Sequence, residues 1–229
     1  MPDNPRLSIV IPVLNEADRL DRCLARLFAQ CPAEDDFEVI VCDGGSDDGS
    51  PQIASRFPCR IEHSQPGRAM QMNQGAGVAR GQLLLFLHAD SILPANAFEY
   101  LRGAAPWGFF RLRLDGEATA YRVIETAINL RSRLSSVAGG DQALFFEREF
   151  FQELGAYPAI PLMEDIAICK AARRRAKPRF IDSALTTSSR RWQSNGLVRT
   201  VLLMWSLRLA YWLGVSPARL HRIYYPQRG

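Results

Sequence analysis

The chain has 229 residues, of which 47% are hydrophobic and 23% are charged, and its net charge is +4. This length suffices for one domain with a proper core but not for two large ones, and the composition excludes a disordered, collagen-like or coiled-coil chain. The charge is uneven, because residues 1–165 hold 15 Arg against 23 acidic residues, whereas residues 166–229 hold 13 Lys and Arg against Asp182 alone. Such a basic end is typical of a solvated face or of a surface that meets an anionic partner, such as a diphosphate or a phospholipid.

The five cysteines favour a reducing compartment. No two of them have C-x-x-C spacing and their number is odd, so neither a zinc site nor a disulfide framework is indicated. Cys23, Cys31 and Cys42 lie within apolar patterns and are expected in the core. Residues 1–6 are short and polar and show no signal peptide. These features together predict a cytoplasmic protein.

Apolar runs alternate with helical patterns over the first 100 residues. Leu83–Leu87 is apolar at every position, which is typical of a central parallel strand buried on both faces. Asn15 and Ser50 are predicted to cap the helices that follow them. The alternation predicts a single α/β domain with a doubly wound, mostly parallel (mixed) sheet. The other predicted strands are Leu7–Ile11, Phe37–Cys42, Cys59–His63, Phe109–Leu114 and Phe180–Thr187, and further helices are predicted over 67–80, from Pro94, over 117–134 and over 165–176.

Leu197–Val215 is the most hydrophobic long stretch. Arg199 and Arg208 are nine positions apart and fall on opposite faces of a helix, so a membrane-spanning helix is rejected. The stretch is interpreted either as a helix packed over the site or as an interfacial helix that touches a membrane. Its aromatic residues, such as Trp205 and Trp212, lie in this apolar segment rather than on a basic stacking face, so no nucleic-acid partner is expected.

Acidic residues follow three of the predicted strands directly. Glu16 comes after the first strand, Asp43 after the second and Asp90 after Leu83–Leu87. In an open α/β sheet, ligands bind outside the carboxyl ends of the strands. We therefore expect these residues, which are far apart in the sequence, to converge on one edge of the sheet.

Three acidic segments, at Asp43, Asp48 and Glu164-Asp165, allow both a structural and a functional interpretation. Asp43 can accept hydrogen bonds from a nucleotide base or ribose, or it can fix an Asx-turn; we favour the ligand role because Asp43 is the first residue past a buried strand. For Asp48, which precedes Gly49, we favour the turn. Glu164-Asp165 can supply a carboxylate base or can stabilise the start of a helix, and position alone favours the helix.

Asp90 and His88 form a candidate metal site. They are two residues apart, so in an extended segment both side chains can face the same side. Carboxylate oxygens suit Mg²⁺ or Mn²⁺, and a neighbouring imidazole is better tolerated by Mn²⁺. A divalent cation there would offset charge on a departing nucleotide diphosphate. The alternative for His88 is a loop histidine that bonds to backbone.

Several common signatures are absent from the sequence. It has no G-x-x-x-x-G-K-[ST] sequence, which excludes a P-loop. It has no G-x-G-x-x-G after the first strand, which disfavours a dinucleotide-binding domain, and no G-x-S-x-G elbow.

Four segments, in order, resemble the family 2 glycosyltransferases of the GT-A fold. The resemblance covers about residues 7–192, with Ser8–Glu16 as the opening strand, Val41–Ser50 as the second-strand motif, Leu87–Asp90 as the Asp-x-Asp metal motif and Glu164-Asp165 as the base. The chain is also similar to the bacterial subgroup called radical-SAM/selenodomain-associated transferase 2. The stretches that carry this similarity are Gly67–Ala76, Phe86–Asp90, Arg131–Arg133, Gly140–Gln142, Met163–Asp165 and Ser189–Trp192.

The resemblance implies four groups of site residues. The catalytic group is Asp165, as general base of an inverting single displacement, together with Glu164, and the metal group is Asp90 with His88. A donor-sugar or acceptor group comprises Gly140, Asp141 and Trp192. The residues implied to bind the nucleotide sugar are Pro12, Asn15, Glu16, Asp43, Arg68 and Arg191.

The sequence departs from the family pattern at two positions. His88 stands at the first aspartate of the metal motif, which leaves the metal identity open. Ser188 stands where the Arg-Trp motif of processive relatives begins with Gln or Arg, so processive polymerisation is not supported. We expect residues 1–192 to form the nucleotide-sugar-binding and catalytic domain, and residues 193–229 to form a basic, aromatic helical segment packed on it.

The sequence thus predicts a glycosyltransferase with a nucleotide-diphosphate sugar donor, a divalent cation (Mn²⁺ or Mg²⁺) and an unidentified acceptor hydroxyl. The acceptor stays open between a lipid phosphate, a small metabolite and a protein, and residues 197–215 are a candidate contact with the inner face of the membrane. A sugar nucleotidyltransferase is one alternative, but it would be expected to carry a Gly-rich basic loop where this chain has Leu-Asn-Glu. A non-catalytic nucleotide-sugar-binding protein at a membrane surface is the other, and His88 is the best argument for it.

Overall fold

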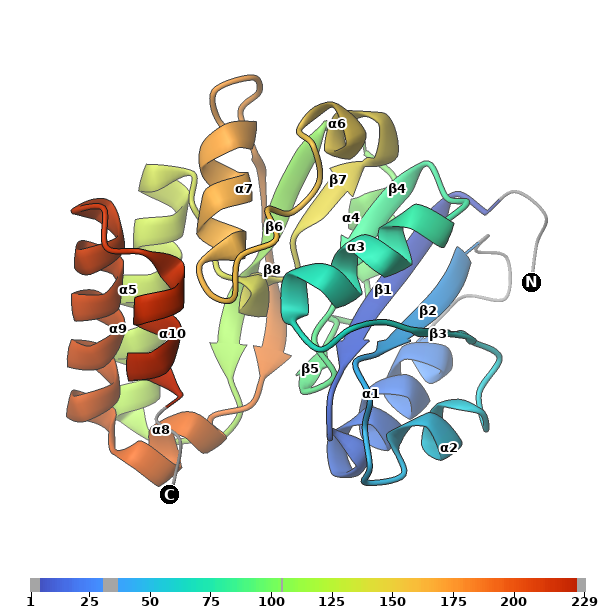
Figure 1. The fold of residues 1–229 in the computed structure, drawn as a ribbon, viewed down its shortest axis with the longest axis horizontal. Coiled ribbons are helices and arrows are strands. Elements are labelled where there is room, and N and C mark those ends of the chain that lie inside the picture. Colours follow the sequence, from blue (N-terminus) through green and yellow to red (C-terminus); the bar gives the residue numbers. More distant parts are fainter. Residues whose placement is uncertain (1–4, 31–36, 104, 226–229) are drawn as a thin grey trace.

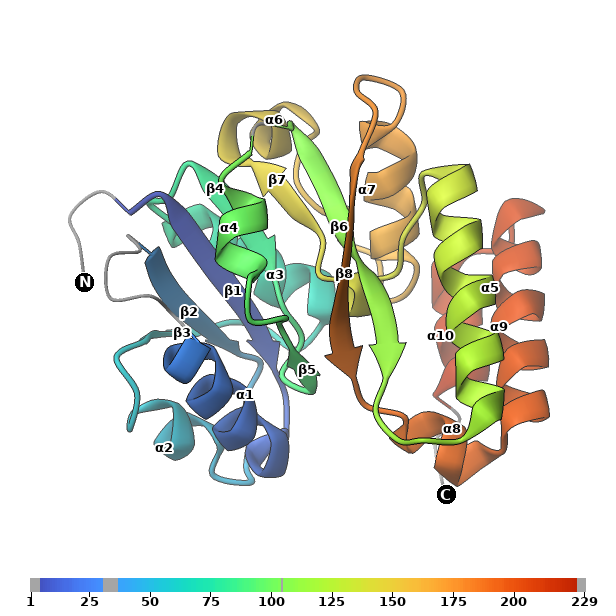
Figure 2. The ribbon, with the colours of Figure 1, turned by 180° about the vertical axis from the view of Figure 1, so that it is seen from behind.

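The computed structural model describes residues 5–30, 37–103 and 105–225, apart from the side chains of Arg191 and Asn195. Within these ranges the chain forms one mixed sheet of eight strands in the order β3-β2-β1-β4-β7-β6-β8-β5, with helices on both faces (Figures 1 and 2). This confirms the predicted fold class. The strands are β1 (Leu7–Val13), β2 (Phe37–Asp43), β3 (Arg60–His63), β4 (Leu83–Phe86), β5 (Ser91–Ile92), β6 (Trp107–Leu114), β7 (Phe145–Glu147) and β8 (Arg179–Thr187).

β1, β2 and β4 are mostly apolar because these strands of the parallel half are buried on both faces of the sheet. β1 pairs in parallel with β2 on one side and with β4 on the other, so that Leu7 lies opposite both Phe37 and Leu83. Successive β1 side chains point to opposite faces, with Ile9 in one core cluster and Val10 in the other, and both are fully buried. The carboxyl ends of β1, β2 and β4 therefore open on the same edge.

The other half of the sheet is mixed. β7 runs antiparallel to both β4 and β6, and β5 runs antiparallel to β8, while β6 and β8 are parallel. The aromatic rings of Phe86, Trp107 and Phe146 pack together where the two halves join, with 6.0 Å between the ring centroids of Trp107 and Phe146. This contact makes one continuous core of the two halves.

Helices cover the two faces of the sheet. Side chains of α1, α2 and α4 share one core cluster with the sheet, whereas those of α3, α6 and α7 share the other together with Leu207 of α9 and Leu220 of α10. The helices are α1 (Ala17–Gln30), α2 (Ser50–Ala54), α3 (Arg68–Val78), α4 (Ala97–Leu101), α5 (Thr119–Ser135), α6 (Arg148–Glu153), α7 (Glu164–Ala172), α8 (Arg190–Asn195), α9 (Leu197–Trp212) and α10 (Pro217–Tyr224), with a 3₁₀ turn η1 at Gly140–Gln142.

The predicted caps of the first two helices are wrong. Asn15 has a left-handed backbone (φ 55°), and its side chain accepts a hydrogen bond from the Asp47 N–H (3.0 Å) rather than from α1. The N-terminus of α1 is stabilised by a different loop, because Asp48 Oδ2 accepts from the Ala17 N–H (2.9 Å). Ser50 is the first residue of α2 and follows Gly49 (φ 87°) instead of capping the helix from outside.

Two further predictions concern the cysteines and the absence of a membrane-spanning helix. Cys23 and Cys42 are buried, as expected for core residues, and no disulfide joins the cysteines of the described ranges; Cys31 lies outside them. Among the described residues, no helix combines the length and the apolar character that crossing a bilayer requires.

Candidate active site

The carboxyl ends of β1 and β2 carry two interlocked loops. The Asn15 N–H donates to Ser46 Oγ (2.9 Å), and the Glu16 N–H donates to Ser50 Oγ (3.1 Å). Together with the bonds of Asn15 and Asp48 described above, these contacts hold the β1–α1 loop against the β2–α2 loop. Glu16 also forms an ion pair with Arg19, and Pro12 at the end of β1 is half-buried.

Asp43 organises the turn that follows β2. Its side chain is nearly fully buried, and its carboxylate accepts hydrogen bonds from the N–H groups of Gly45 (3.0 Å) and Ser46 (3.1 Å). His63 Nδ1 lies 3.8 Å from the same carboxylate. Asp43 therefore stabilises the turn, which is the structural interpretation of this residue. Its recognition of a nucleotide base stays a prediction.

Gln71 fixes the start of α3 at this edge. Its side-chain amide donates to the carbonyl oxygens of Val13 and Cys42, the second at 3.0 Å, which ties α3 to the ends of β1 and β2. Arg68, at the N-terminus of α3, is thereby held beside α7, and its Nη1 lies 3.7 Å from Glu164 Oε1. Gln71 was not predicted as a site residue, although it lies within Gly67–Ala76, one of the segments that resemble the transferase subgroup.

Asp165, the predicted base, and His88, the predicted metal ligand, both lie next to Gly140. The Gly140 N–H donates to Asp165 Oδ2 (2.9 Å), which joins η1 to the start of α7. A Cβ added at Gly140 would lie 2.8 Å from His88 Nε2, so this position accepts only a glycine without some movement of the imidazole. Segments 88, 140 and 165, widely separated in the sequence, therefore meet at one place.

The pKa of Asp141 responds to the charges of both Asp165 and Asp90, which indicates that Asp90 lies near these two residues. Burial first, then the negative charge of Asp165, raises the pKa of Asp141 to about 6; Arg131 opposes this shift and Asp90 adds to it. The pKa of Glu164 is raised by burial and by Asp165, against the charge of Arg68. We call Asp90, Asp141, Glu164 and Asp165 the acidic cluster. Carboxylates gathered in this way favour the binding of a cation, and Arg68 and Arg131 offset part of their charge.

We expect Asp141→Asn to stabilise the protein at neutral pH and not in acid. The raised pKa means that the folded state prefers the protonated carboxyl, so ionisation costs stability that accumulates as pH rises from about 4 to about 6. An amide never ionises, so the free energy of unfolding should rise by about 3 kcal/mol at pH 7.5 and by less than about 1 kcal/mol at pH 4. Urea unfolding without divalent cations measures both values.

The matched control for Asp141→Asn is Asp182→Asn. Asp182 is 74% exposed on β8 and pairs with Arg111 at the surface (3.0 Å), so its replacement should change the free energy of unfolding little at either pH. An equal gain at pH 4 and pH 7.5 in Asp141→Asn would contradict the assigned burial of a charge.

A cavity of about 180 Å³ lies beside Asp90, at the end of the sheet where β6 and β8 finish. It is smaller than the roughly 300–1,000 Å³ of most small-molecule sites, so it is too small to enclose a ligand the size of a nucleotide sugar. Arg19 and Arg22 of α1 lie on its wall, and no sequence motif pointed to them. The lining residues are Asp18, Arg19, Arg22, Cys23, Ala89, Asp90, Ser91, Ile92, Asp115, Thr186, Thr187 and Ser188.

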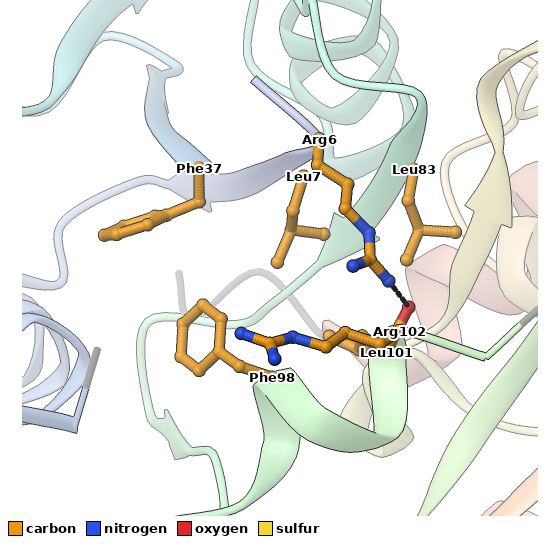
Figure 3. Close-up of a pocket in the computed structure, with 7 residues that line it drawn as sticks. All are labelled: Arg6, Leu7, Phe37, Leu83, Phe98, Leu101 and Arg102. Atoms are coloured by element: carbon orange, nitrogen blue, oxygen red, sulfur yellow. Dashed lines mark hydrogen bonds between the residues drawn. The ribbon is translucent and has the colours of Figure 1, made fainter. Parts of the chain in front are cut away.

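The opposite edge of the sheet is closed. The cavity there measures about 30 Å³, room for about one water, and is lined by the first residues of β1, β2 and β4 (Figure 3). Arg6 extends across it and donates to the Leu101 carbonyl (3.3 Å). Ligand binding is thus directed to the carboxyl edge.

The remaining predicted site residues lie in α8. Trp192 packs in a small apolar cluster with Leu112, Leu114 and Tyr121, and no described contact joins it to the acidic cluster. The side chain of Arg191 lies outside the described residues. The sugar contact of Trp192 and the diphosphate contact of Arg191 stay predictions.

The fit of a divalent cation depends on ligands from the substrate. Within the parts of the chain that the structure describes, no three His, Cys, Asp or Glu side chains are grouped so that they hold a metal by themselves. Mg²⁺ and similar ions are commonly bound by one or two carboxylates together with substrate phosphates. The carboxylate of Asp90, the adjacent acidic cluster and the imidazole of His88 fit that arrangement.

Solved structures share this architecture. S. aureus TarS (residues 1–349) superposes with a TM-score of 0.65 and 16% identity, over 80% of this chain and 60% of that one. The mannosyltransferase PcManGT from Pyrobaculum calidifontis, solved with GDP-Man and Mn²⁺, superposes with a TM-score of 0.61 and 20% identity, over 90% of this chain and 61% of that one. The fold with its carboxyl-edge site is therefore the GT-A fold of glycosyltransferases.

The sequence comparison gives the family. The model of glycosyl transferase family 2 matches residues 8–176, and the chain belongs to this family. Glycosyltransferase AglE from Haloferax volcanii is 36% identical over 93 residues, which are 38% of this chain and 31% of that protein. A poly(ribitol-phosphate) beta-glucosyltransferase from Bacillus spizizenii is 29% identical over 100 residues, 40% of this chain and 16% of that protein. The chain thus spans less than a third of the length of these two relatives.

Proposed function

We propose that the chain transfers a sugar from a nucleoside-diphosphate sugar to an acceptor hydroxyl, with inversion at the anomeric carbon. The observation that carries this proposal is the hydrogen bond from Gly140 to Asp165, because it sets a carboxylate beside His88 and Asp90 at the carboxyl edge, where ligands bind in open α/β sheets. Structural neighbours support the donor class, since TarS was solved with UDP and with UDP-GlcNAc and PcManGT with GDP-Man.

Asp165 is the proposed base. Its Oδ2 accepts from Gly140 (2.9 Å) and its Oδ1 from its neighbour Ile166 (2.7 Å), which fixes the carboxylate plane. A carboxylate has about four acceptor sites, so a lone pair remains to receive a proton. The acceptor hydroxyl gives its proton to Asp165 and its oxygen attacks the anomeric carbon, while the bond from that carbon to the diphosphate oxygen breaks and the nucleoside diphosphate leaves.

The departing diphosphate needs positive charge. Arg68 supplies part of it at the N-terminus of α3. A divalent cation held by Asp90 and His88, together with the diphosphate, would supply the rest by offsetting the negative charge that develops on the leaving group. Neighbours with Mn²⁺ or Mg²⁺ support this proposal.

The acceptor is proposed only as a hydroxyl compound, lipid-linked if residues 197–215 contact a membrane. The division into a catalytic part, residues 1–192, and a packed C-terminal part, residues 193–229, stays a proposal. So does membership of the radical-SAM/selenodomain-associated subgroup.

The proposal is tested by a thermal-shift screen of UDP, GDP and their sugars, with and without Mn²⁺. A ligand that binds only the native state adds roughly 2.7 kcal/mol to the free energy of unfolding when its concentration is 100 times its Kd. The melting temperature rises as a result. We expect a shift with one nucleotide and a larger one with Mn²⁺ present. Turnover is then read as release of nucleoside diphosphate. Release of pyrophosphate from a nucleoside triphosphate would instead identify a nucleotidyltransferase, and binding without turnover across many acceptors would identify a non-catalytic protein.

A further inference from the structure

α9 exposes an apolar stripe along its whole length. Its large hydrophobic side chains recur at intervals of three and four residues, which places them on one face of the helix. Val198 is 74% exposed, Trp205 67% and Trp212 72%, although these residue types are usually buried. The full stripe comprises Val198, Leu202, Trp205, Leu209 and Trp212.

A second stripe lies on the neighbouring helix. Both views show α5 beside α9 at the end of the molecule far from the N-terminus (Figures 1 and 2). On α5, Val123, Leu130 and Leu134 are all more than half exposed and are again spaced by a whole number of helical turns. Two adjacent helices that expose apolar stripes point to an interaction surface rather than to scattered surface residues.

The opposite face of α9 is fixed to the protein. Leu207 is buried in the core, and the Tyr211 ring lies 4.9 Å from Lys170 Nζ of α7. Burial, and next the charge of Asp165, raises the pKa of Tyr211. The stripe is therefore a permanent feature of the folded surface, carried by a helix whose other side adjoins the acidic cluster.

The charge around the stripe selects the partner. Residues 183–229 contain seven Arg and no Asp or Glu. Arg199 on α9 and Arg219 and Arg222 on α10 are exposed. A second copy of the chain would bring these arginines against one another, whereas anionic lipid headgroups would complement them. Exposed tryptophans also favour the boundary between headgroups and acyl chains.

We propose that α9, with α5 beside it, docks the protein on the surface of an anionic lipid bilayer without crossing it. The helix would lie in the plane of the interface, with its apolar stripe toward the acyl chains and the arginines at the headgroups. This inference does not depend on the proposed transfer reaction, because docking is measured without donor or acceptor.

The test is co-sedimentation of the chain with vesicles. One set contains phosphatidylcholine alone, and the other contains phosphatidylcholine and phosphatidylglycerol in equal amounts. We expect at least about tenfold tighter partitioning to the anionic vesicles, weakened by added salt. The double variant Trp205→Ser/Trp212→Ser should lower the partitioning to anionic vesicles by at least about tenfold. The double variant Arg199→Gln/Arg222→Gln should remove most of the preference for anionic lipid.

Tyr100→Ser is the matched control, because Tyr100 is a 36% exposed aromatic residue on α4 at another part of the surface. It should partition as the unchanged chain does. All variants are checked for folding by circular dichroism and for nucleotide-induced thermal shift, neither of which docking should affect. The inference is overturned if the unchanged chain does not bind anionic vesicles, or if the variant Trp205→Ser/Trp212→Ser binds them as tightly as the unchanged chain does. It is also overturned if light scattering shows that the unchanged chain is a dimer and that only this variant abolishes the dimer.

Discussion

Replacing Asp165 by Asn is expected to lower kcat for sugar transfer by about 10³-fold or more while leaving the affinity for the donor within a few-fold. Positioned general bases contribute roughly 10²–10⁴-fold to a rate, and in the described ranges no second carboxylate shares the contacts that Asp165 makes with Gly140 and Ile166. The Asn side chain keeps an oxygen that can accept from the Gly140 N–H, so η1 and α7 should stay joined. The loss should therefore appear in kcat and not in donor binding.

The experiment compares Asp165→Asn with Asp182→Asn under saturating donor and Mn²⁺. Asp182 is an exposed carboxylate on β8, and its replacement should leave kcat unchanged. A second readout comes from charge: Asp165 raises the pKa of Asp141, so the neutral variant should lower that pKa and reduce the pH dependence of stability described above. Turnover that survives in Asp165→Asn would remove Asp165 from the base role.

The parallel half of the fold was predictable from the sequence because its strands are buried on both faces. β1, β2 and β4 are short, mostly apolar runs of seven, seven and four residues, and this length is typical of strands rather than of helices. The polar residues that follow these strands could then be assigned to one edge by topology alone. This rule places His88 and Asp90 at that edge, whereas Asp165 lies at the start of α7 and was placed there only by the resemblance to the family motif.

The mixed half was predictable only in part. β6 and β8 were recognised as apolar runs, but β7 has three residues and β5 has two, and no periodicity can be read over such lengths. Their pairing is set by tertiary contact, since Phe145 and Phe146 extend the sheet between β4 and β6. The caps failed for a related reason, because the group that stabilises the start of α1 comes from a loop more than 30 residues away.

The site contains residues that local patterns do not reveal. Arg131 sits within α5 at a position that any surface arginine could occupy, yet its charge opposes the raised pKa of Asp141. Arg19 and Arg22 reach the cavity beside Asp90 from α1. Only the packing of α5 and α1 around the carboxyl edge gives these side chains a place in the site.

Replacing Asp90 by Asn should lower kcat/KM for the nucleotide sugar by about 10²-fold or more and remove the Mn²⁺-dependent part of donor binding. The change preserves shape, because Ser91 Oγ can still bond to the Asn oxygen as it now does to Asp90 Oδ1 (3.4 Å). It removes the one carboxylate of the proposed metal pair, and a hard cation binds a neutral amide much less well than a carboxylate. Titration calorimetry of Mn²⁺ and UDP, with the variant and with the unchanged chain, measures the effect independently of turnover.

Two variants make this test decisive. Asp115→Asn removes another carboxylate that lines the same cavity, so it should leave the Mn²⁺ dependence intact and thereby separate a metal ligand from a general loss of negative charge. His88→Asp restores the acidic pair of the family motif, and the space beside Gly140 accommodates this smaller side chain. Because an imidazole favours Mn²⁺ and oxygen ligands favour Mg²⁺, that variant should shift the preferred cation toward Mg²⁺. Equal Mn²⁺ binding by Asp90→Asn and Asp115→Asn would show that the cation is held elsewhere, and the departing diphosphate would then depend on arginine charge, with Arg68 as the first residue to replace.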